Sequence, residues 1–335
     1  MWWHLTPMSD GLLTKRDIRD RFGDAGQRRA LLFSVVALPG LLAACAPSAS
    51  RSPSPHAVSP APLRTPATPA PSPAPADPLS GCPKAVSFSA LPVVARMAGA
   101  DDLAAAPDGS IWISDARAAL EHHTLSGTLL QRIADPRIPE GIVVLSDGSL
   151  LVAEQGPDRV VQLQPSSGAV RTVVQLTPRS GVAGVDGIAY QPETATVLIP
   201  DSPNGTLLSV PLAGGAPARL ATGLGRPVGV AVLAEAGFAV AAEDSTGLFH
   251  VAARGGAITP LAGVTQGDDV VASGRLAYVT SLTTHQLIAV DPATARTRML
   301  VSGDPMPQGL AVLPDGSLVL SDSSSGAIVR VGACG

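Results

Sequence analysis

The chain has 335 residues and a net charge of −4, and only 15% of its residues are charged. Lys15 and Lys84 are its two lysines, so it lacks the clustered basic face that nucleic-acid binding requires, and we exclude that function. Aromatic residues make up 3%, whereas Val, Ala, Leu and Gly are plentiful, which favours many short strands joined by tight turns.

Residues 1–44 have the pattern of an export signal. A region with several arginines precedes a short apolar run, Ala30–Leu38, which is followed by Pro39-Gly40. The run is far shorter than the ~20 residues that span a bilayer, and a basic region before a short apolar segment is typical of a signal that is cleaved. The pair Arg28-Arg29 is also compatible with twin-arginine export, with the general secretory route as the alternative.

The signal ends in Leu42-Ala43-Ala44-Cys45. This sequence resembles the lipobox of bacterial lipoproteins, in which the cysteine is lipidated and becomes the first mature residue. The resemblance implies lipidation of Cys45 and a protein anchored through a lipid bilayer at the outer face of the cell membrane. An ordinary secretory signal with an incidental cysteine is the alternative.

Residues 45–80 are dominated by Pro, Ala and Ser, as in Pro69–Pro75. Proline fixes φ and removes backbone donors, so this stretch is expected to form an extended tether rather than a packed core. The remaining residues, 81–335, are expected to form one domain.

Six segments of this domain share one plan: a polar or acidic residue, a glycine, an apolar strand, a tight turn, a second strand and a closing acid. Glu140–Glu154 and Gln308–Asp322 show the pattern most clearly, and each has Asp-Gly at the turn, a strong hairpin signal. The segments begin at Asp101, Glu140, Asp186, Val228, Asp268 and Gln308, at intervals of 39, 46, 42, 40 and 40 residues. A four-stranded unit repeated about every 40 residues predicts an all-β fold, a six-bladed β-propeller with four-stranded antiparallel blades.

The sequence motif of the repeat resembles that of the NHL-repeat and gluconolactonase-like (SMP-30-like) six-bladed propellers. The resemblance is clear in Gly309-Leu310-Ala311 and Asp315-Gly316-Ser317-Leu318. The resemblance covers residues 91–331. It supports the fold strongly but leaves the activity open, because propellers host many functions.

The last repeat has only three visible strands, near 309–313, 318–322 and 327–331. We expect Leu91–Met97 to supply the fourth, outer strand, so that the two ends of the domain close the ring in one blade. Cys82 and Cys334 would flank this junction, and an exported protein can keep a disulfide between them. Two unpaired thiols are the alternative.

Because blade strands alternate in direction, the first residue of strand one and the last residue of strand two lie on the same face. At the inner positions this face has four carboxylates, Asp101, Glu140, Asp186 and Asp268, with Gln308 and Val228 completing the ring. Crowded carboxylates repel each other unless they are neutralised. A hard cation with oxygen ligands, most simply Ca²⁺, would neutralise them, so the four acids are candidate metal ligands. The alternative is a ring of solvated carboxylates.

The ends of strand two form an outer set on the same face: Asp115, Glu154, Asp201, Glu243, Ser281 and Asp322. In NHL-type repeats the acid at this position commonly accepts hydrogen bonds from nearby loop amides, so the outer set is expected to be structural.

The resemblance to gluconolactonases and paraoxonase-like lactonases implies a channel metal held by Glu, Asp and Asn. The acids can be carried over, but Asn204 is the one asparagine of the chain and lies in a turn, Pro203-Asn204-Gly205, where it is not expected to reach the axis. The histidines offer no general base at the mouth, because His122 and His123 are expected on a third strand, pointing to opposite sides of the sheet.

Two functions follow. The preferred one is an extracytoplasmic propeller, expected to be monomeric, that binds a small molecule, a cell-wall component or a protein partner at its acidic mouth. The alternative is a Ca²⁺-dependent lactonase, in which the cation would polarise a carbonyl or activate water. No catalytic residue can be assigned for either.

Overall fold

The computed structural model describes residues 77–335 except 116–118, 136, 234–235, 244–245 and 262. The predicted export signal, Cys45 and nearly all of the tether lie outside the described residues, and their assignments stay predictions. Residues 76–335 form one compact unit. No helix in the described ranges is long and apolar enough to cross a membrane.

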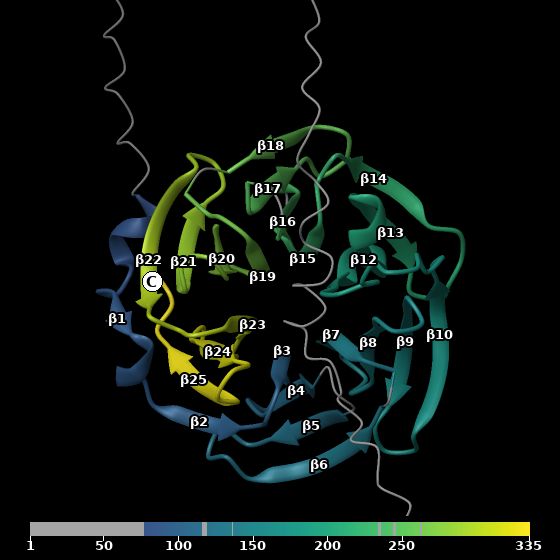
Figure 1. The fold of residues 1–335 in the computed structure, drawn as a ribbon, viewed down its shortest axis with the longest axis horizontal. Helices are drawn as coiled ribbons and strands as arrows, with labels where there is room; N and C mark the ends of the chain where they lie inside the picture. The colour runs from purple at the N-terminus through teal and green to yellow at the C-terminus, as the bar shows by residue number, and fades with distance from the viewer. Residues whose placement is uncertain (1–76, 116–118, 136, 234–235, 244–245, 262) are drawn as a thin grey trace, which may run out of the picture. The chain divides into compact units, whose positions relative to one another are not determined.

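Six sheets surround a central axis, and each begins with an inner strand and ends at the rim (Figure 1). Blade 1 consists of β3 (Ala100–Ala105), β4 (Ile111–Asp115), β5 (Ala119–His123) and β6 (Leu129–Ala134). Blade 2 consists of β7 (Pro139–Val144), β8 (Leu150–Glu154), β9 (Arg159–Gln164) and β10 (Ala169–Gln175). Blade 3 consists of β11 (Ala189–Gln191), β12 (Thr196–Asp201), β13 (Thr206–Pro211) and β14 (Ala218–Thr222).

The other three blades repeat this order. Blade 4 consists of β15 (Pro227–Val232), β16 (Phe238–Ala242), β17 (Leu248–Val251) and β18 (Ile258–Pro260). Blade 5 consists of β19 (Gly267–Ser273), β20 (Leu276–Ser281), β21 (Gln286–Asp291) and β22 (Arg296–Ser302). Blade 6 consists of β23 (Pro307–Val312), β24 (Leu318–Asp322), β25 (Ala327–Val331) and, from the N-terminal side, β2 (Val93–Arg96). The predicted six-bladed propeller is confirmed.

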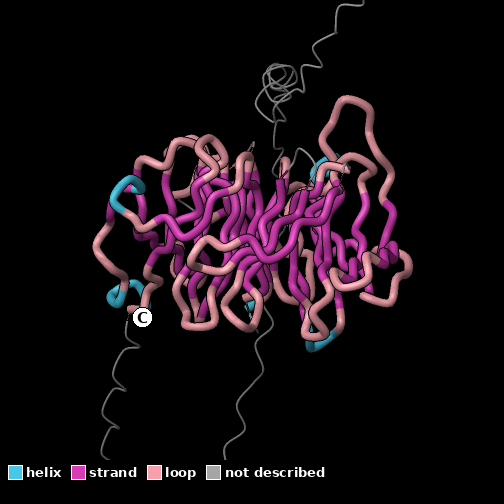
Figure 2. The backbone as a smooth tube through the Cα atoms, turned by 90° about the horizontal axis from the view of Figure 1, so that it is seen from below, coloured by secondary structure: helices cyan, strands magenta, loops and turns pink. Residues whose placement is uncertain are grey.

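Strands and loops account for nearly all of the described chain (Figure 2). The helical segments are short 3-10 turns: η1 (Pro78–Gly81), η2 (Phe88–Ala90), η3 (Pro192–Thr194) and η4 (Ser202–Asn204).

The Asp-Gly-Ser turns join strands one and two in blades 1, 2 and 6. In blade 1 the Ser110 amide donates to Asp108 Oδ1 at 2.9 Å, and Gly109 between them has φ +86°. The serine hydroxyl then contacts a polar side chain on strand three: Ser110 with His122 Nε2 at 2.6 Å, Ser149 with Gln162 Nε2 at 2.8 Å and Ser317 with Arg330 Nε at 3.0 Å. Because the same contact recurs in three blades, it is a structural feature of the repeat rather than part of a functional site.

The core is a ring of apolar junctions rather than one central cluster. In the described part of the chain, six clusters of buried residues each join two adjacent blades. Trp112 and Leu120 of blade 1, for example, pack with Leu150 and Val152 of blade 2. Side chains of both faces of each blade are therefore buried, which explains the near-continuous apolar runs in strand two.

The N-terminal segment closes the ring as predicted. β2 pairs antiparallel with β25, with Val93 opposite Val329 and Arg96 opposite Ala327. The structure adds a strand that the sequence did not predict, because β1 (Val86–Ser87) pairs in parallel with β22 and makes blade 5 five-stranded. The segment therefore contacts blade 5 before it completes blade 6.

Cys82 and Cys334 form the predicted disulfide, across a sequence separation of 252 residues. Nearby, the Cys334 amide donates to the Tyr278 hydroxyl at 3.1 Å, and the Gly335 amide donates to the Gly81 carbonyl at 3.3 Å. The bond therefore links η1 and the segment leading to β1, rather than the start of β2, to the end of β25.

We expect loss of this bond to destabilise the propeller. In the chain-entropy model, a closed loop of this length contributes about 5.5 kcal/mol. The double variant Cys82→Ser/Cys334→Ser should therefore unfold at a lower denaturant midpoint than the oxidised wild type, and dithiothreitol should lower the wild-type midpoint to the same value. Equal midpoints for the oxidised wild type and the double variant would show that the β2–β25 pairing closes the ring unaided.

Candidate functional site

In five of the six blades a bulge lies at the ring residue of the inner strand, whereas in blade 3 Asp186 precedes β11 and no bulge occurs. In blade 1, Ala100 pairs with Asp115 but Leu103 pairs with Ile113, so Asp101 and Asp102 together face one residue of β4. Register shifts at the corresponding place also occur in blades 2, 4, 5 and 6. A bulge of this kind re-aims a side chain out of the regular ladder. The predicted ring thus has a backbone cause that the sequence pattern did not reveal.

Backbone contacts between neighbouring blades hold the ring together. The Gly141 amide donates to the Asp186 carbonyl at 3.1 Å, and the Gly187 amide donates to the Val228 carbonyl at 2.6 Å. A Cβ atom on Gly141, Gly187 or Gly229 would lie 2.7 Å from the carbonyl oxygen of the next ring residue, and one on Gly309 would lie 2.3 Å from Asp101 O. The glycine of the repeat is therefore required by the close approach of two blades.

Three buried hydroxyls on strand two fill the gap that the bulge opens. Ser114, Thr280 and Ser321 accept hydrogen bonds from the amides of Asp102, Asp269 and Gly309 at 3.0, 2.9 and 2.8 Å. Thr280 also donates to the Gln308 carbonyl at 3.0 Å, and Ser321 donates to the Asp101 carbonyl at 2.7 Å. Sequence reasoning missed these residues, although each immediately precedes the last residue of strand two.

Gln308 bridges two carboxylates of the ring. With its amino group turned toward them, Nε2 donates to Asp101 Oδ1 and to Asp268 Oδ2, each at 2.9 Å. The structure thus brings together three of the ring residues, from blades 6, 1 and 5. All are buried: Gln308 is 1%, Asp101 3% and Asp268 5% exposed.

Asp186 lies beside a different set of donors. Gln155 Nε2 lies 3.5 Å and the Arg226 guanidinium 3.9 Å from Asp186 Oδ2. Arg226 also pairs with Glu243 at the end of strand two in blade 4. The Arg226 guanidinium therefore links Asp186 of the inner ring to Glu243 of the outer set. Sequence reasoning did not identify Arg226, which directly precedes Pro227. Glu140, 0% exposed, completes the predicted four acids.

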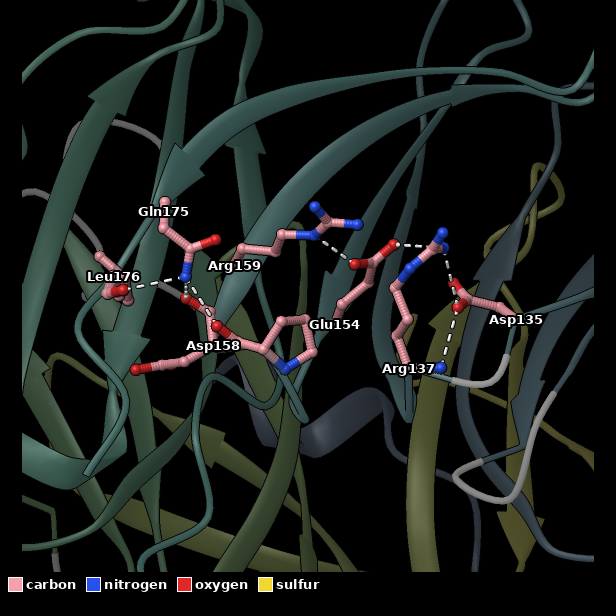
Figure 3. Close-up of polar contacts among 8 residues, drawn as sticks. Asp135, Arg137, Glu154, Asp158, Arg159, Gln175 and Leu176 are labelled. Carbon is pink, nitrogen blue, oxygen red and sulfur yellow. Dashed lines mark hydrogen bonds and ion pairs between the residues drawn. The ribbon is translucent and has the colours of Figure 1, made fainter. Parts of the chain in front are cut away.

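The outer acids are held by their own neighbours. Glu154 contacts Arg137 at 3.3 Å and also pairs with Arg159, and Arg137 continues to Asp135 Oδ1 at 3.3 Å (Figure 3). Asp322 accepts from the amides of Ser324 and Ser325 at 3.1 and 3.2 Å. Asp322 thus has the expected loop-amide contacts, whereas Glu154 and Glu243 pair with arginines.

Asp269 occupies a position where four of the other blades have glycine and blade 1 has Asp102, and it links blade 5 to blade 6. Its carboxylate accepts from the Leu310 amide of blade 6 at 2.6 Å and from the Val270 amide at 2.7 Å. Burial raises the pKa of Asp269 to about 7, although these two amides act in the opposite direction.

Asp304 and Asp322 form a pair of acids at the entry to blade 6, and blade 2 has an equivalent pair in Asp135 and Glu154. In both blades the first acid accepts from the amide two residues later, at 3.1 Å. In blade 2 that residue is Arg137, whose guanidinium bridges the pair, whereas in blade 6 it is Met306. Burial and the neighbouring Asp322 therefore raise the pKa of Asp304 to about 8. Asp304 Oδ2 has no hydrogen-bond partner among the described residues.

With its amide turned to donate, Gln308 can bridge Asp101 and Asp268 without a metal ion. Asn204 is directed elsewhere, because it donates to Asp201 at 3.0 and 2.9 Å. Within the described ranges, no group of three or more His, Cys, Asp or Glu side chains is arranged to hold a metal. The assignment of calcium to the four acids stays a prediction.

The four described histidines contact residues outside the ring. His122 stacks on Trp112 with ring centroids 4.5 Å apart, and His123 Nε2 lies 2.8 Å from Glu121 on the other side of the blade. His250 donates to the Ala236 carbonyl at 2.6 Å, and His285 Nδ1 donates to the Asp304 carbonyl at 3.0 Å. None of these contacts involves a ring residue.

These features define a six-bladed β-propeller with a ring of buried carboxylates where its inner strands begin. No protein-family model and no curated protein sequence matches the chain.

Solved structures do match. A gluconolactonase from Xanthomonas campestris has a TM-score of 0.61 and 13% identity, over 72% of this chain and 88% of that one. The calcium-binding regucalcin from Agrobacterium tumefaciens has a TM-score of 0.60 and 15% identity, over 73% and 94%. A virginiamycin B lyase from Staphylococcus aureus has a TM-score of 0.55 and 14% identity, over 70% and 81%. The chain thus shares the six-bladed fold of the gluconolactonase and regucalcin propellers, at identities that establish the fold alone.

We expect Gly309→Ala to destabilise the propeller by at least about 2 kcal/mol, because the added methyl group would overlap the Asp101 carbonyl. Chemical denaturation measures the change. Gly332→Ala is the matched control, since a Cβ there lies 3.8 Å from Pro83 and should cost little. Equal stability of the two variants would mean that blades 6 and 1 are not in close contact at the axis.

The raised pKa of Asp304 predicts a pH-dependent stability. Between about pH 4 and pH 8 the folded state retains a proton that the unfolded chain has released. The free energy of unfolding should therefore fall as pH rises through this window, by at most about 1.4 kcal/mol per pH unit, and level off above it. Asp304→Asn, which stays neutral, should reduce this slope, leaving the part that the raised pKa of Asp269 contributes below about pH 7, and it should be at least as stable as the wild type at pH 9.

Urea unfolding at several pH values measures this effect. Asp315→Asn is the control, because Asp315 is exposed and its lowered pKa places its titration below the window. A wild-type slope that persists unchanged in Asp304→Asn would contradict the assignment.

Proposed function

We propose that this chain is a non-catalytic binding protein of the cell envelope. A lipid on Cys45 would anchor it at the outer face of the membrane, and residues 45–80 would hold the propeller away from the bilayer. The acidic channel mouth of the monomeric propeller would bind a cationic group of a small molecule, a cell-wall component or a protein partner.

The observation that carries this proposal is the Gln308 bridge. Its amide is fixed between Asp101 and Asp268 at 2.9 Å from each, in a buried position, so the ring is oriented by the protein's own donors. A site whose polar groups are already oriented loses little entropy when a ligand binds. Binding is thus supported without a requirement for a metal ion.

The charges of the mouth indicate the chemistry of the ligand. The inner ring has four acids. Four acids of the outer set lie at the ends of strand two: Glu154, Asp201, Glu243 and Asp322. The arginines that contact these acids are Arg137, Arg159 and Arg226. The acids outnumber these arginines, so the local potential is negative and favours a cationic ligand.

A metal-dependent lactonase remains the alternative function, and the structural similarity to a gluconolactonase is what favours it. That reaction would require a cation to displace the Gln308 amide from the two carboxylates and a general base among the ring acids. The geometry gives this alternative less support, because the donor set of the ring differs from that of a lactonase.

The test compares two cations on the full-length chain carrying Cys45→Ser, which avoids the lipid. In EDTA and at low salt, a fluorescent oligoarginine peptide should bind, and the affinity should fall as salt screens the mouth. Asp101→Asn/Asp268→Asn should weaken binding by about tenfold or more. Asp315→Asn, which removes an exposed acid at the opposite end of the strands, should not change it.

Calcium and lactones decide between the two functions. Added Ca²⁺ should leave the thermal midpoint of the EDTA-treated chain unchanged. A rise in the midpoint that Asp268→Asn abolishes, together with hydrolysis of a lactone, would overturn the binding proposal in favour of the enzyme. Absence of peptide binding at low salt would also overturn it.

A further inference from the structure

A second polar cavity lies on blade 3, away from the ring. It has a volume of about 440 Å³ and is lined by Asp201, Asn204, Thr206, Leu208, Arg219 and Thr222. Strand pairing explains this grouping, because Thr206 is opposite both Asp201 and Thr222, and Leu208 is opposite Arg219. Cross-strand partners point to the same side of a sheet, so these side chains share one face.

The carboxylate of the cavity is held in a fixed position. Asn204 Nδ2 donates to both oxygens of Asp201 at 3.0 and 2.9 Å, and the Thr206 hydroxyl donates to Oδ2 at 3.4 Å. The neighbouring turn is fixed as well, because Arg179 donates to the Pro203 carbonyl in η4. The single asparagine of the chain thus orients Asp201.

Excess negative charge surrounds Asp201. Asp158 is 1% exposed, and its Oδ2 has no hydrogen-bond partner among the described residues. Burial raises the pKa of Asp158, and the charge of Asp201 raises it further, although the Val185 amide acts in the opposite direction. A cation bound at Asp201 would relieve this repulsion.

Arg219 supplies the opposite charge on the same cavity wall. Its side chain is exposed, and within the described part of the chain it forms no ion pair. A guanidinium is well suited to bind a carboxylate through two parallel hydrogen bonds. The cavity therefore presents an anion on β12 and a cation on β14, with the Thr206 hydroxyl on β13 between them and Thr222 on β14 beside Arg219.

We propose that this cavity binds a small zwitterion, such as an amino acid or a short peptide with free ends, whose ammonium contacts Asp201 and whose carboxylate contacts Arg219. Such a ligand neutralises both charges of the cavity, whereas a simple cation or anion would neutralise only one. The volume is sufficient for a dipeptide. This site shares none of the inner-ring residues, although Asp201 is also one of the outer acids.

The experiment uses alanyl-alanine as the probe, with isothermal titration calorimetry on the full-length chain carrying Cys45→Ser. We expect binding that is detectable at about 10 mM of the dipeptide. N-acetylation or C-amidation of the dipeptide should each weaken binding by about tenfold or more, because each removes one charge.

Arg219→Ala should weaken binding of alanyl-alanine to a similar extent, and it should fold normally because the side chain is exposed. Arg298→Ala, at an exposed arginine of β22 in blade 5, is the matched control and should bind as the wild type does. No binding of the free dipeptide, equal binding of the capped dipeptides or undiminished binding by Arg219→Ala would each overturn the proposal.

Discussion

The close contact of adjacent inner strands at the axis is the constraint on which the rest of the structure depends. There the glycine of one blade lies against the carbonyl of the next ring residue, as with Gly141 and Asp186 or Gly309 and Asp101. The contact leaves no room for a Cβ atom. It fixes the distance between blades and, through the bulge, it turns one side chain of the inner strand out of the ladder.

Electrostatics at the mouth follow from that geometry. Because the bulge brings carboxylates together, the structure has to neutralise or protonate them, and it does so in different ways around the ring. Gln308 bridges Asp101 and Asp268, and Arg226 lies beside Asp186. Outside the ring, burial and the neighbouring Asp322 raise the pKa of Asp304 to about 8.

The two ends of the propeller strands also differ in chemistry. The acids lie where inner strands begin, whereas a cavity of about 380 Å³ near the opposite ends of β3, β7, β11 and β23 is lined mainly by apolar residues, among them Leu145, Tyr190 and Leu313. Propeller strands alternate in direction, so each face collects residues from the same positions of every repeat. A repeated sequence thus gives the molecule two chemically distinct mouths.

The sequence by itself determined the number of blades, their strand order, the closing strand, the disulfide partners and the acidic face, because these depend on local periodicity and on a repeat that is visible along the chain. The tertiary structure decided what the repeat could not encode. The Gln308 bridge joins three blades, Arg226 joins Asp186 of the inner ring to Glu243 of the outer set, and β1 adds a strand to blade 5. Each of these contacts joins residues that are distant in sequence. Whether such side chains meet depends on how the blades pack together, which the repeat pattern along the chain does not reveal.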